Sequence, residues 1–261
     1  GEPRNAASTS LHGFLSRDGI APAELLAIGR DQLREYDSVT LRSGRVVGSR
    51  RVDPGFLVTT EEGKQYASRM LLLATGVSDT LPSVPGVEEF YGRGVHHCPY
   101  CDGWEYRDGR LGVYGVDAFG VALEVRQWSR DIVLLADGSA LPDRVRSRLR
   151  RADIRVEMRS VAGFEGNGRL QRVRFTDGEA LERDAVFFKT HTAERSGLPR
   201  SLGCEMTANG LVKTGRFEIT RIPGLFVAGD ASRNVQLAIV AAAEGAQAAF
   251  AINTALMKGV R

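Results

Sequence analysis

The segment from Leu111 to Leu135 constrains the fold of this chain more than any other. It reads in order as a strand, a loop bounded by glycines, a helix and a second strand, over residues 111–114, 115–120, 121–129 and 131–135. Strand–helix–strand units with a glycine-containing turn belong to parallel sheets, which bind nucleotides at the carboxyl ends of their strands. We therefore expect an α/β fold that includes a unit of nucleotide-binding type.

Other segments extend this α/β pattern. Residues 66–76 predict a buried strand that ends in a turn of small residues, and residues 224–230 predict another. Asn234 can cap a long alanine-rich helix over 235–256. Between these segments we expect a helix over 142–151 and strands over 154–158, 170–175 and 185–188.

Composition narrows the class of protein. A chain of 261 residues with 43% apolar content can bury a substantial core, and its length suits two compact domains or one elaborated domain. The 35 basic residues nearly balance the 32 acidic ones, so nucleic acid is not an expected partner. Apolar runs are interrupted, as at Glu244, before they reach the roughly 20 residues that a membrane helix needs. We expect a soluble protein with no membrane contact.

The first residues and the cysteines bear on cellular location. The chain starts with glycine and lacks the basic-then-apolar order of a secretory signal, which predicts that a preceding segment was removed or left out. Three cysteines are too few for a disulfide scaffold, and two of them are closely spaced. This pattern favours a catalytic pair in a reducing compartment, so we expect a cytoplasmic protein.

Cys98 and Cys101 form the strongest local motif, Cys-Pro-Tyr-Cys, which Asp102 follows directly. Two intervening residues keep the sulfurs close enough to alternate between dithiol and disulfide. A carboxyl group beside them can protonate a leaving thiolate or accept a proton from an attacking thiol. Half of a zinc site is the alternative, but zinc takes four ligands, and only His96–His97 and the distant Cys204 remain. We predict redox catalysis by this pair, with Asp102 as acid and base and no metal.

Several other reactive side chains have a structural interpretation. Cys204 has no partner nearby in the sequence and is expected to pack as a small apolar residue. His12 and His191 are assigned structural roles in the same way. A basic run predicts a solvated helix face or, alternatively, a docking site for an acidic protein; it consists of Arg144, Arg146, Arg148, Arg150, Arg151, Arg155 and Arg159.

Gly229 and Asp230 end the strand predicted over 224–230, just before the long helix. The carboxylate can accept a hydrogen bond from a cofactor hydroxyl, and a helix N-terminus favours negative charge on a ligand such as a reduced flavin. The same order of strand, Gly-Asp and helix also occurs in unrelated α/β proteins. This turn alone therefore leaves a cofactor site and a structural turn as open alternatives.

The order of four motifs resembles the thioredoxin reductase-like FAD-dependent pyridine nucleotide-disulfide oxidoreductases and the related small-molecule dithiol oxidases. The motifs span essentially the whole chain: Ala74-Thr75-Gly76, Gly92-Arg93-Gly94-Val95 with the cysteine pair, Gly115–Gly120, and Gly224–Asp230. The resemblance implies two Rossmann-like three-layer domains, in which an inserted NAD(P)-binding-like domain interrupts an FAD-binding domain. The expected limits are 1–92 and 219–261 for the FAD-binding domain and 93–218 for the insert.

The resemblance also implies roles for individual residues. Cys101 would be the sulfur nearer the flavin, Cys98 would exchange with substrate, and Asp102 would be the acid-base group. Asp230 would contact the ribityl chain or the pyrophosphate of FAD. The other cofactor-binding residues implied are Asn5 near the adenine, Thr75, Gly76 and Gly229 beside the flavin, Gln236, Leu237 and Ala238 near the isoalloxazine ring, and Gly115 and Gly120 in the second nucleotide loop.

Three departures from the family pattern bear on the cofactors. The strand, Gly-x-Gly-x-x-Gly loop and helix that open such proteins are not in this sequence, which therefore reads as N-terminally truncated. Asp117 replaces the middle glycine of the second loop, where a pyrophosphate would approach the backbone. Asp137 stands where related thioredoxin reductases carry a His-Arg-Arg cluster for the NADPH phosphate; it would repel a phosphate but could accept from a free ribose. We expect FAD, and we expect NADH to be less excluded than NADPH.

Three functions remain open at this point. A reductase would use a nicotinamide or another donor to reduce FAD and then the disulfide of a thioredoxin-like protein or small molecule. An oxidase would close a small dithiol to a disulfide, with oxygen as the final acceptor, and the two aspartates favour this version or a donor other than NADPH. A silent remnant would keep the fold for protein binding, although the intact Cys98, Cys101 and Asp102 argue against it. Members of the family are commonly homodimers, so a homodimer is expected.

Overall fold

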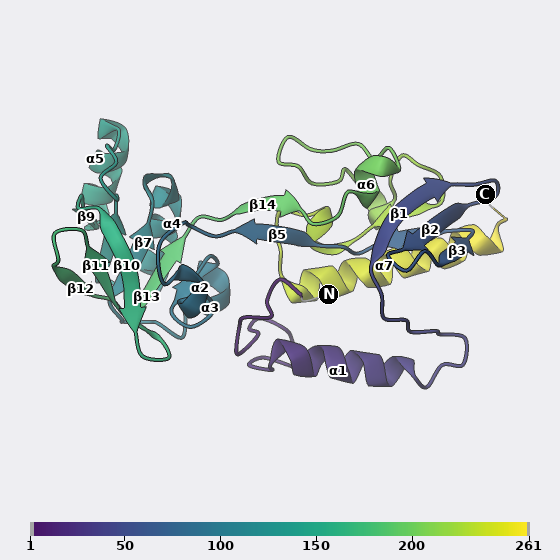
Figure 1. Ribbon diagram of the computed structural model, residues 1–261, viewed down its shortest axis with the longest axis horizontal. Helices are drawn as coiled ribbons and strands as arrows, with labels where there is room; N and C mark the ends of the chain where they lie inside the picture. The colour runs from purple at the N-terminus through teal and green to yellow at the C-terminus, as the bar shows by residue number, and fades with distance from the viewer. Residues whose placement is uncertain (1–2, 260–261) are drawn as a thin grey trace.

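The chain forms two lobes joined by a two-stranded ribbon (Figure 1). The computed structural model describes residues 3–259, so the outermost residues of the expected segments 1–92 and 219–261 lie outside the described residues. The ribbon pairs β5 (Val77–Thr80) with β14 (His191–Glu194) in antiparallel register, with His191 opposite Thr80. The chain therefore enters and leaves the first lobe at adjacent points.

A five-stranded sheet forms the centre of the first lobe, with strand order β6-β13-β7-β8-β9 and every pairing parallel. Every residue of β8 and β13 is buried, as expected for a sheet that is covered on both faces. The strands are β6 (Val95–His96), β7 (Leu111–Tyr114), β8 (Ile132–Leu135), β9 (Arg155–Glu157) and β13 (Ala185–Phe188).

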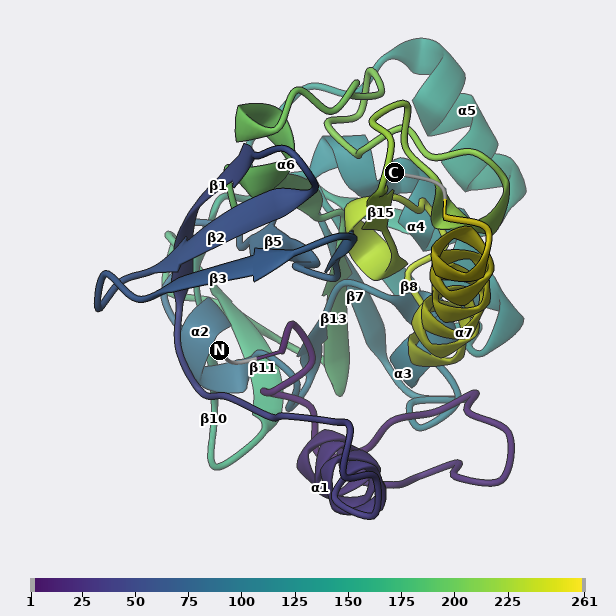
Figure 2. The ribbon, with the colours of Figure 1, turned by 90° about the vertical axis from the view of Figure 1, so that its right-hand side faces the viewer.

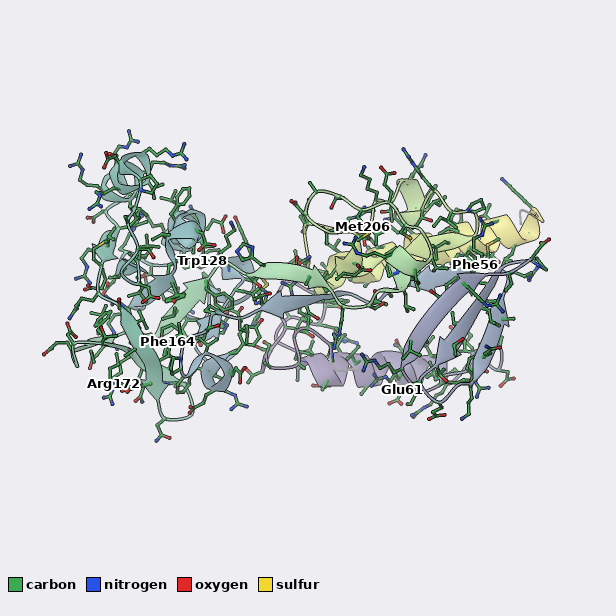
Figure 3. All side chains as sticks on the ribbon, turned by 45° about the horizontal axis from the view of Figure 1, so that its top comes forward. Phe56, Glu61, Trp128, Phe164, Arg172 and Met206 are labelled. Atoms are coloured by element: carbon green, nitrogen blue, oxygen red, sulfur yellow. A yellow bond between two sulfur atoms is a disulfide. The ribbon has the colours of Figure 1, made fainter. Side chains whose placement is uncertain are left out.

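Helices cover one face of this sheet and an antiparallel sheet covers the other. Ile132 and Leu134 of β8 pack against the helices, whereas Val133 and Leu135 pack against the second sheet, as the two-residue repeat of a strand dictates. Phe164 in the second sheet and Trp128 beyond the helix layer are labelled in Figure 3. The covering elements are α4 (Phe119–Glu124), α5 (Asp143–Arg151), the 3₁₀ turns at Val116–Ala118 and Val125–Gln127, and β10 (Val161–Gly166), β11 (Leu170–Phe175) and β12 (Ala180–Glu182); α2 (Val87–Phe90) and α3 (Pro99–Asp102) are single turns.

The second lobe combines an antiparallel meander, a short parallel pair and two long helices. Figure 2 shows the meander and α7 on either side of β15, with α1 below them. The core of this lobe contains Phe56, Leu73, Leu225 and Val227. Its elements are α1 (Pro22–Leu33), the meander β1 (Val46–Arg51), β2 (Phe56–Thr60) and β3 (Gln65–Ser68), the pair β4 (Leu71–Leu73) and β15 (Leu225–Val227), α6 (Leu198–Ser201), the 3₁₀ turns Arg216–Glu218 and Gly229–Ala231, and α7 (Ala238–Met257).

The core packing groups some residues differently from the expected domain limits. Phe90 of α2 is buried in the first lobe, although it falls in the expected flavin segment 1–92. Leu198 and Val212 are buried beside Phe56 in the second lobe, although they fall in the expected insert 93–218. The first lobe therefore lies between Thr80 of β5 and His191 of β14.

Three predicted elements are wrong in detail. The strand expected over 66–76 is two strands, because β3 pairs with β2 whereas β4 pairs with β15. The long C-terminal helix begins at Ala238 after Leu237, which makes no side-chain cap, so Asn234 does not cap it. The helix expected to reach Ser129 ends at Glu124 and continues only as a 3₁₀ turn. Residues 66–76 divide into two strands because their pairing partners, β2 and β15, lie elsewhere in the sequence. The two helices differ from the prediction because the backbone is extended at Leu237 and forms a 3₁₀ turn over Val125–Gln127.

Helix α7 is long and apolar enough, by length and composition, to span a membrane, and it is the one such helix within residues 3–259. Polar residues interrupt the 20 residues of this helix, so a count of uninterrupted apolar runs along the sequence does not identify it. Glu244, in its second turn, is buried and hydrogen-bonded inside the protein. One helix of this kind is weak evidence for a membrane span, and residues from its first half line the cavity described next.

Candidate active site

A large cavity lies between the N-terminal segment, the start of α7 and the segment that carries the cysteine pair. It encloses about 890 Å³, a size typical of pockets for small ligands and cofactors. Its wall is mostly apolar. Of the site residues predicted from the sequence, those that line this cavity are Asn5, Thr75, Gly76, Cys101, Asp102, Gly229, Asp230, Gln236, Leu237 and Ala238.

Cys98 and Cys101 form a disulfide across the single turn α3, with their Cα atoms 5.3 Å apart. Pro99 begins this turn, where its fixed φ suits the first helical position. The amides of Cys101 and Asp102 both donate to the carbonyl oxygen of Cys98 at 3.2 Å. Only Cys101 of the pair lines the cavity, and Tyr100 between them is exposed. Cys101 is thus the sulfur on the cavity side.

Asp102 pairs with the neighbouring imidazole of His96, whose Nδ1 lies 3.1 Å from Asp102 Oδ1. The His96 side chain is 5% exposed. The Gly94 amide donates to His96 Nε2 at 3.1 Å, and the Tyr106 hydroxyl lies 3.2 Å from the same nitrogen. Because Nε2 accepts a hydrogen bond, the ring proton is on Nδ1 and is directed at Asp102. His96 therefore holds the carboxylate beside the disulfide.

His97 points away from His96 and contacts Tyr91. Its Nδ1 lies 2.8 Å from the Tyr91 hydroxyl, and the two rings stack with centroids 5.9 Å apart. Burial lowers the pKa of His97, so this imidazole is neutral near neutral pH. Burial and the Asp79 carboxylate raise the pKa of Tyr91, which keeps its hydroxyl protonated. A neutral, hydrogen-bonded pair thus lines the cavity near Asp102.

Asp79 of β5 connects Tyr91 to the N-terminal segment. It accepts hydrogen bonds from the Tyr91 hydroxyl at 3.3 Å and from Thr190 Oγ1 at 3.1 Å. Arg4 donates to both carboxylate oxygens of Asp79 at 2.6 Å, and the two side chains are 14% and 6% exposed. Arg4 also lies 3.4 Å from Asp230. One guanidinium therefore links the ribbon between the lobes to the Gly229–Asp230 turn.

Replacement of Asp79 by asparagine should reduce the acid sensitivity of the fold. Burial alone would raise the pKa of Asp79, but the hydrogen bonds from Arg4, the charge of Arg4 and the bond from Thr190 outweigh it, so its pKa is lowered. The stabilisation is complete above the unfolded-state pKa, about 4, and is lost as the pH falls through the lower folded-state pKa. Urea midpoints measured from pH 7 down to about pH 2 should fall less steeply for Asp79→Asn. Asp37→Asn, which changes an exposed carboxylate, should keep the parent slope; an equal slope for Asp79→Asn would contradict the expectation.

The cavity wall contains polar groups suited to a flavin. Thr75 Oγ1 is buried and has no hydrogen-bond partner among residues 3–259. Burial raises the pKa of Asp230, although Arg4 opposes this effect. A free hydroxyl and a partly desolvated carboxylate beside an apolar wall suit the hydroxyl-rich ribityl chain and flat ring of a flavin, since buried polar groups require partners. The residues present therefore fit this part of FAD.

The second nucleotide loop lies in the first lobe, and neither Gly115 nor Gly120 lines the cavity. Gly115 has a φ of +94°, and a Cβ there would lie 2.9 Å from Asp117 Oδ1. Asp117 Oδ2 lies 3.4 Å from His191 Nε2. The loop is therefore occupied by a carboxylate of the chain itself, where an open backbone would be needed for a pyrophosphate.

Asp137, at the end of β8, is also engaged within the lobe. Its Oδ2 accepts from the Tyr114 hydroxyl at 2.6 Å and its Oδ1 accepts from the Val161 amide at 2.8 Å. Asp137 has a φ of 51°, a region that Asp and Asn enter more readily than most residues. Each oxygen thus has one protein partner and can accept a further hydrogen bond, so the expected role as an acceptor for a free ribose stays a prediction.

The remaining candidates have structural surroundings. Burial raises the pKa of Cys204 to about 11, which makes this thiol unreactive. His12 lies 3.4 Å from Asp18 and 3.3 Å from Glu105, so it links the N-terminal segment to residues that follow the disulfide. Within residues 3–259 no group of three or more His, Cys, Asp and Glu side chains is arranged to hold a metal.

Sequence reasoning missed the roles of Arg4, Tyr91 and His97 in this wall and of Asp79, which bonds to Arg4 and Tyr91. His96 and His97 were considered only as zinc ligands. The nearest available signal was their position directly before Cys98, since residues next to a redox pair share its site. No sequence pattern related Arg4 to Asp79, which lies 75 positions away.

Comparison with known proteins supports the fold and the motif order. Residues 20–245 match the model of the pyridine nucleotide-disulphide oxidoreductase family. The thioredoxin reductase tcpT of Claviceps purpurea is 33% identical over 247 residues, which are 88% of this chain and 76% of that protein. A protein of Arthroderma benhamiae is 28% identical over 273 residues, which are 88% of this chain and 66% of that protein, so this chain spans about two thirds of its length.

Solved structures agree with this assignment. TrxB of Bacillus anthracis superposes with a TM-score of 0.93 at 32% identity, over 99% of this chain and 89% of that chain. HlmI superposes with a TM-score of 0.94 at 37% identity, over 99% of this chain and 83% of that chain. An α/β fold shared over nearly the whole length, a cysteine pair beside a cofactor-sized cavity and a matching family model lead to one conclusion. The chain belongs to the thioredoxin reductase-like pyridine nucleotide-disulphide oxidoreductase family.

Proposed function

We propose that this protein is an FAD-dependent thiol-disulfide oxidoreductase that passes an electron pair between a bound flavin and a substrate disulfide or dithiol through Cys98 and Cys101. One observation carries the proposal: Cys101 and Asp102 share a cavity wall with Thr75 and Asp230, which suit a flavin. The isoalloxazine ring, when bound, supplies or accepts the electron pair that a dithiol–disulfide exchange requires.

The proposal includes a division of the chain into two domains. The second lobe, with the predicted cofactor-binding residues Asn5, Thr75, Gly76, Gly229, Asp230, Gln236, Leu237 and Ala238, would form the FAD-binding domain. The first lobe, with its central parallel sheet and the loop from Gly115 to Gly120, would be the inserted domain of NAD(P)-binding type. Its limits are earlier than the expected ones at both ends, since the first lobe begins after Thr80 of β5 rather than at 93 and ends before His191 of β14 rather than at 218.

In the reducing direction, the outer sulfur performs the first exchange. The thiolate of Cys98 attacks one substrate sulfur, so that a mixed disulfide forms and the other substrate sulfur leaves as a thiolate. The thiolate of Cys101 then attacks the sulfur of Cys98, which releases the second substrate thiol and restores the Cys98–Cys101 disulfide. The oxidising direction is the reverse sequence. The position of Cys101 on the cavity side supports this order.

Asp102 would move the protons of this exchange. It follows Cys101 directly and is held 3.1 Å from Nδ1 of His96. The leaving thiolate takes a proton from Asp102, and the attacking thiol returns one to it. His96 positions this carboxylate, whereas His97, which lies on the same wall, is hydrogen-bonded to Tyr91 instead.

Small-molecule dithiol oxidation is the second candidate, and a specific observation favours it. Asp117 and Asp137 place a carboxylate at each of the two positions expected to receive a nicotinamide dinucleotide, and negative charge there disfavours its phosphates. An oxidase needs no such donor, because the substrate dithiol supplies the electron pair and dioxygen takes it up as hydrogen peroxide. FAD is then the one cofactor of the reaction, and NAD(P)H is dispensable.

The proposed partners follow from the same chemistry. A thioredoxin-like protein or a small disulfide or dithiol would dock beside the exposed Tyr100, next to the outer sulfur. A second copy of the chain would form a homodimer, for which the exposed Phe250 and Met257 of α7 supply apolar surface. Nucleic acid and membrane are not proposed as partners, and a reducing cytoplasm is the proposed location.

An absorbance spectrum of the purified protein tests the proposal directly. We expect flavin bands, and we expect anaerobic addition of a small dithiol to bleach them. Bleaching by NADH or NADPH, in separate cuvettes, would identify the reductase and reject the oxidase. Protein that stays colourless after incubation with FAD would instead support a silent member of the family and overturn the proposed chemistry.

A further inference from the structure

An ionic cluster with two buried carboxylates contacts the Gly229–Asp230 turn. Glu244 of α7 is 4% exposed and accepts a hydrogen bond from the Gly229 amide through Oε2 at 2.7 Å. Its other oxygen, Oε1, accepts from Nε of Arg233. Arg233 also donates to Glu218, which is 2% exposed, and to Thr214 at 3.0 Å. Three chain segments therefore meet at one guanidinium.

This cluster is costly for stability, which points to a positional role. Burial of two carboxylates around one guanidinium carries a large desolvation penalty, and apolar replacements of such groups are often neutral or stabilising. Burial raises the pKa of Glu218 in spite of the opposing Arg233 charge. Phe217 and Glu218 also adopt left-handed φ angles of 59° and 62°, a strained conformation for residues that are not glycine. The fold thus accepts two unfavourable features in order to bring Glu218 to Arg233.

The turn that this cluster contacts needs such a support. Gly229 has a φ of +78°, which glycine adopts easily but does not enforce. The next residue, Asp230, has its carboxylate on the cavity wall, and its partner there, Arg4, comes from the far end of the chain. The bond from the Gly229 amide to Glu244 ties the backbone of this turn directly to α7.

We propose that Glu244 is a positioning residue of the cofactor site: its hydrogen bond from the Gly229 amide, supported by Arg233 and Glu218, sets the turn that presents Asp230 to the flavin. This inference rests on the proposed flavin function. It assigns Glu244 no contact with the cofactor, because Glu244 does not line the cavity. The effect passes through the backbone of residues 229 and 230.

Three variants separate the hydrogen bond from the charge and from the bulk of the side chain. Glu244→Gln retains an oxygen that accepts from the Gly229 amide, whereas Glu244→Met has similar length and no such oxygen. Loss of a hydrogen bond to a charged group should raise the dissociation constant for FAD about tenfold or more in Glu244→Met. Glu244→Gln should stay within about threefold of the parent, and Gln247→Ala, one turn further along an exposed face of α7, should match the parent.

Titration of the flavin-free protein with FAD, followed by the quenching of flavin fluorescence, measures these constants. Hydrogen exchange of a peptide covering residues 225–234 of the flavin-free protein supplies a readout independent of the cofactor. We expect exchange to accelerate in Glu244→Met and to return to the parent rate in Glu244→Gln. Equal FAD affinity and equal exchange in Glu244→Met would overturn the inference, as would equal loss in both variants. If the parent itself binds no FAD, the proposed function fails, and the exchange rates still decide whether Glu244 fixes the turn.

Discussion

Replacement of Cys101 by serine should abolish disulfide exchange, by about a thousandfold or more in turnover, while flavin binding stays close to that of the parent. A hydroxyl cannot form the internal disulfide, so Cys98 would remain in a mixed disulfide with substrate and the cycle would stop there. Serine is close to cysteine in size, and Cys101 lines a wide cavity, so the fold should tolerate the substitution. Turnover measured with a dithiol or a disulfide substrate checks the loss of exchange, and mass spectrometry after incubation with a disulfide substrate detects the trapped adduct.

Cys204→Ser provides the matched control for this substitution. Its thiol lies apart from the cavity and is unreactive because burial raises its pKa to about 11. We expect parental turnover and no trapped adduct from this variant. Residual turnover of Cys101→Ser above a tenth of the parent value would mean that electrons reach the substrate by a route other than the disulfide, and the proposed mechanism would be wrong.

Asp102→Asn should lower turnover by about a hundredfold to ten-thousandfold, the range of a lost general acid or base. Asparagine keeps an oxygen that accepts the proton of His96 Nδ1, so the geometry beside the disulfide should persist. It cannot release or take up a proton, so leaving thiolates must be protonated by water. The signature is a rate that depends more steeply on pH than that of the parent, measured as turnover between about pH 6 and pH 9.

The control for Asp102 is Asp108→Asn, a change of an exposed carboxylate on the same stretch of chain. Asp108 has a φ of 60°, which asparagine also adopts readily. This variant should retain the parental rate and pH profile. If Asp102→Asn keeps more than half of the parental rate, proton transfer from another group carries the reaction and the role proposed for Asp102 is wrong.

Buried runs of apolar residues made most of the first lobe predictable. The strand over 111–114 was placed correctly, and the strand expected over 131–135 begins one residue later. All of β8 and all of β7 except Tyr114 are buried, so both runs lack charged residues. The redox pair was equally easy to predict, because its two cysteines lie within four consecutive residues and no distant contact is needed to bring them together. The segment 66–76 failed for the opposite reason: β3 is exposed and β4 is only partly buried, so the run gives no sign of the turn between them.

The cavity wall could be predicted only in part. Thr75, Asp230 and Gln236 were expected there because they stand in motifs shared with a known family. Arg4 and Asp79 are joined by two hydrogen bonds across 75 positions, and only the folded chain brings them together. In the sequence, Glu244 was interpreted only as an interruption of an apolar run. In the structure its carboxylate accepts a hydrogen bond from the amide of Gly229, 15 residues earlier.

The pairing of β5 with β14 has a consequence for how this molecule can change over generations. Thr80 and His191 lie opposite one another, so the two ends of the first lobe are adjacent in space. A stretch of gene that encodes such a lobe can be lost, gained or exchanged without cutting through the core of the other lobe, because its ends already meet. The second lobe, which carries Thr75 and Asp230, can thus be inherited unchanged while the first lobe changes the electron donor or acceptor that it binds, or loses the ability to bind one.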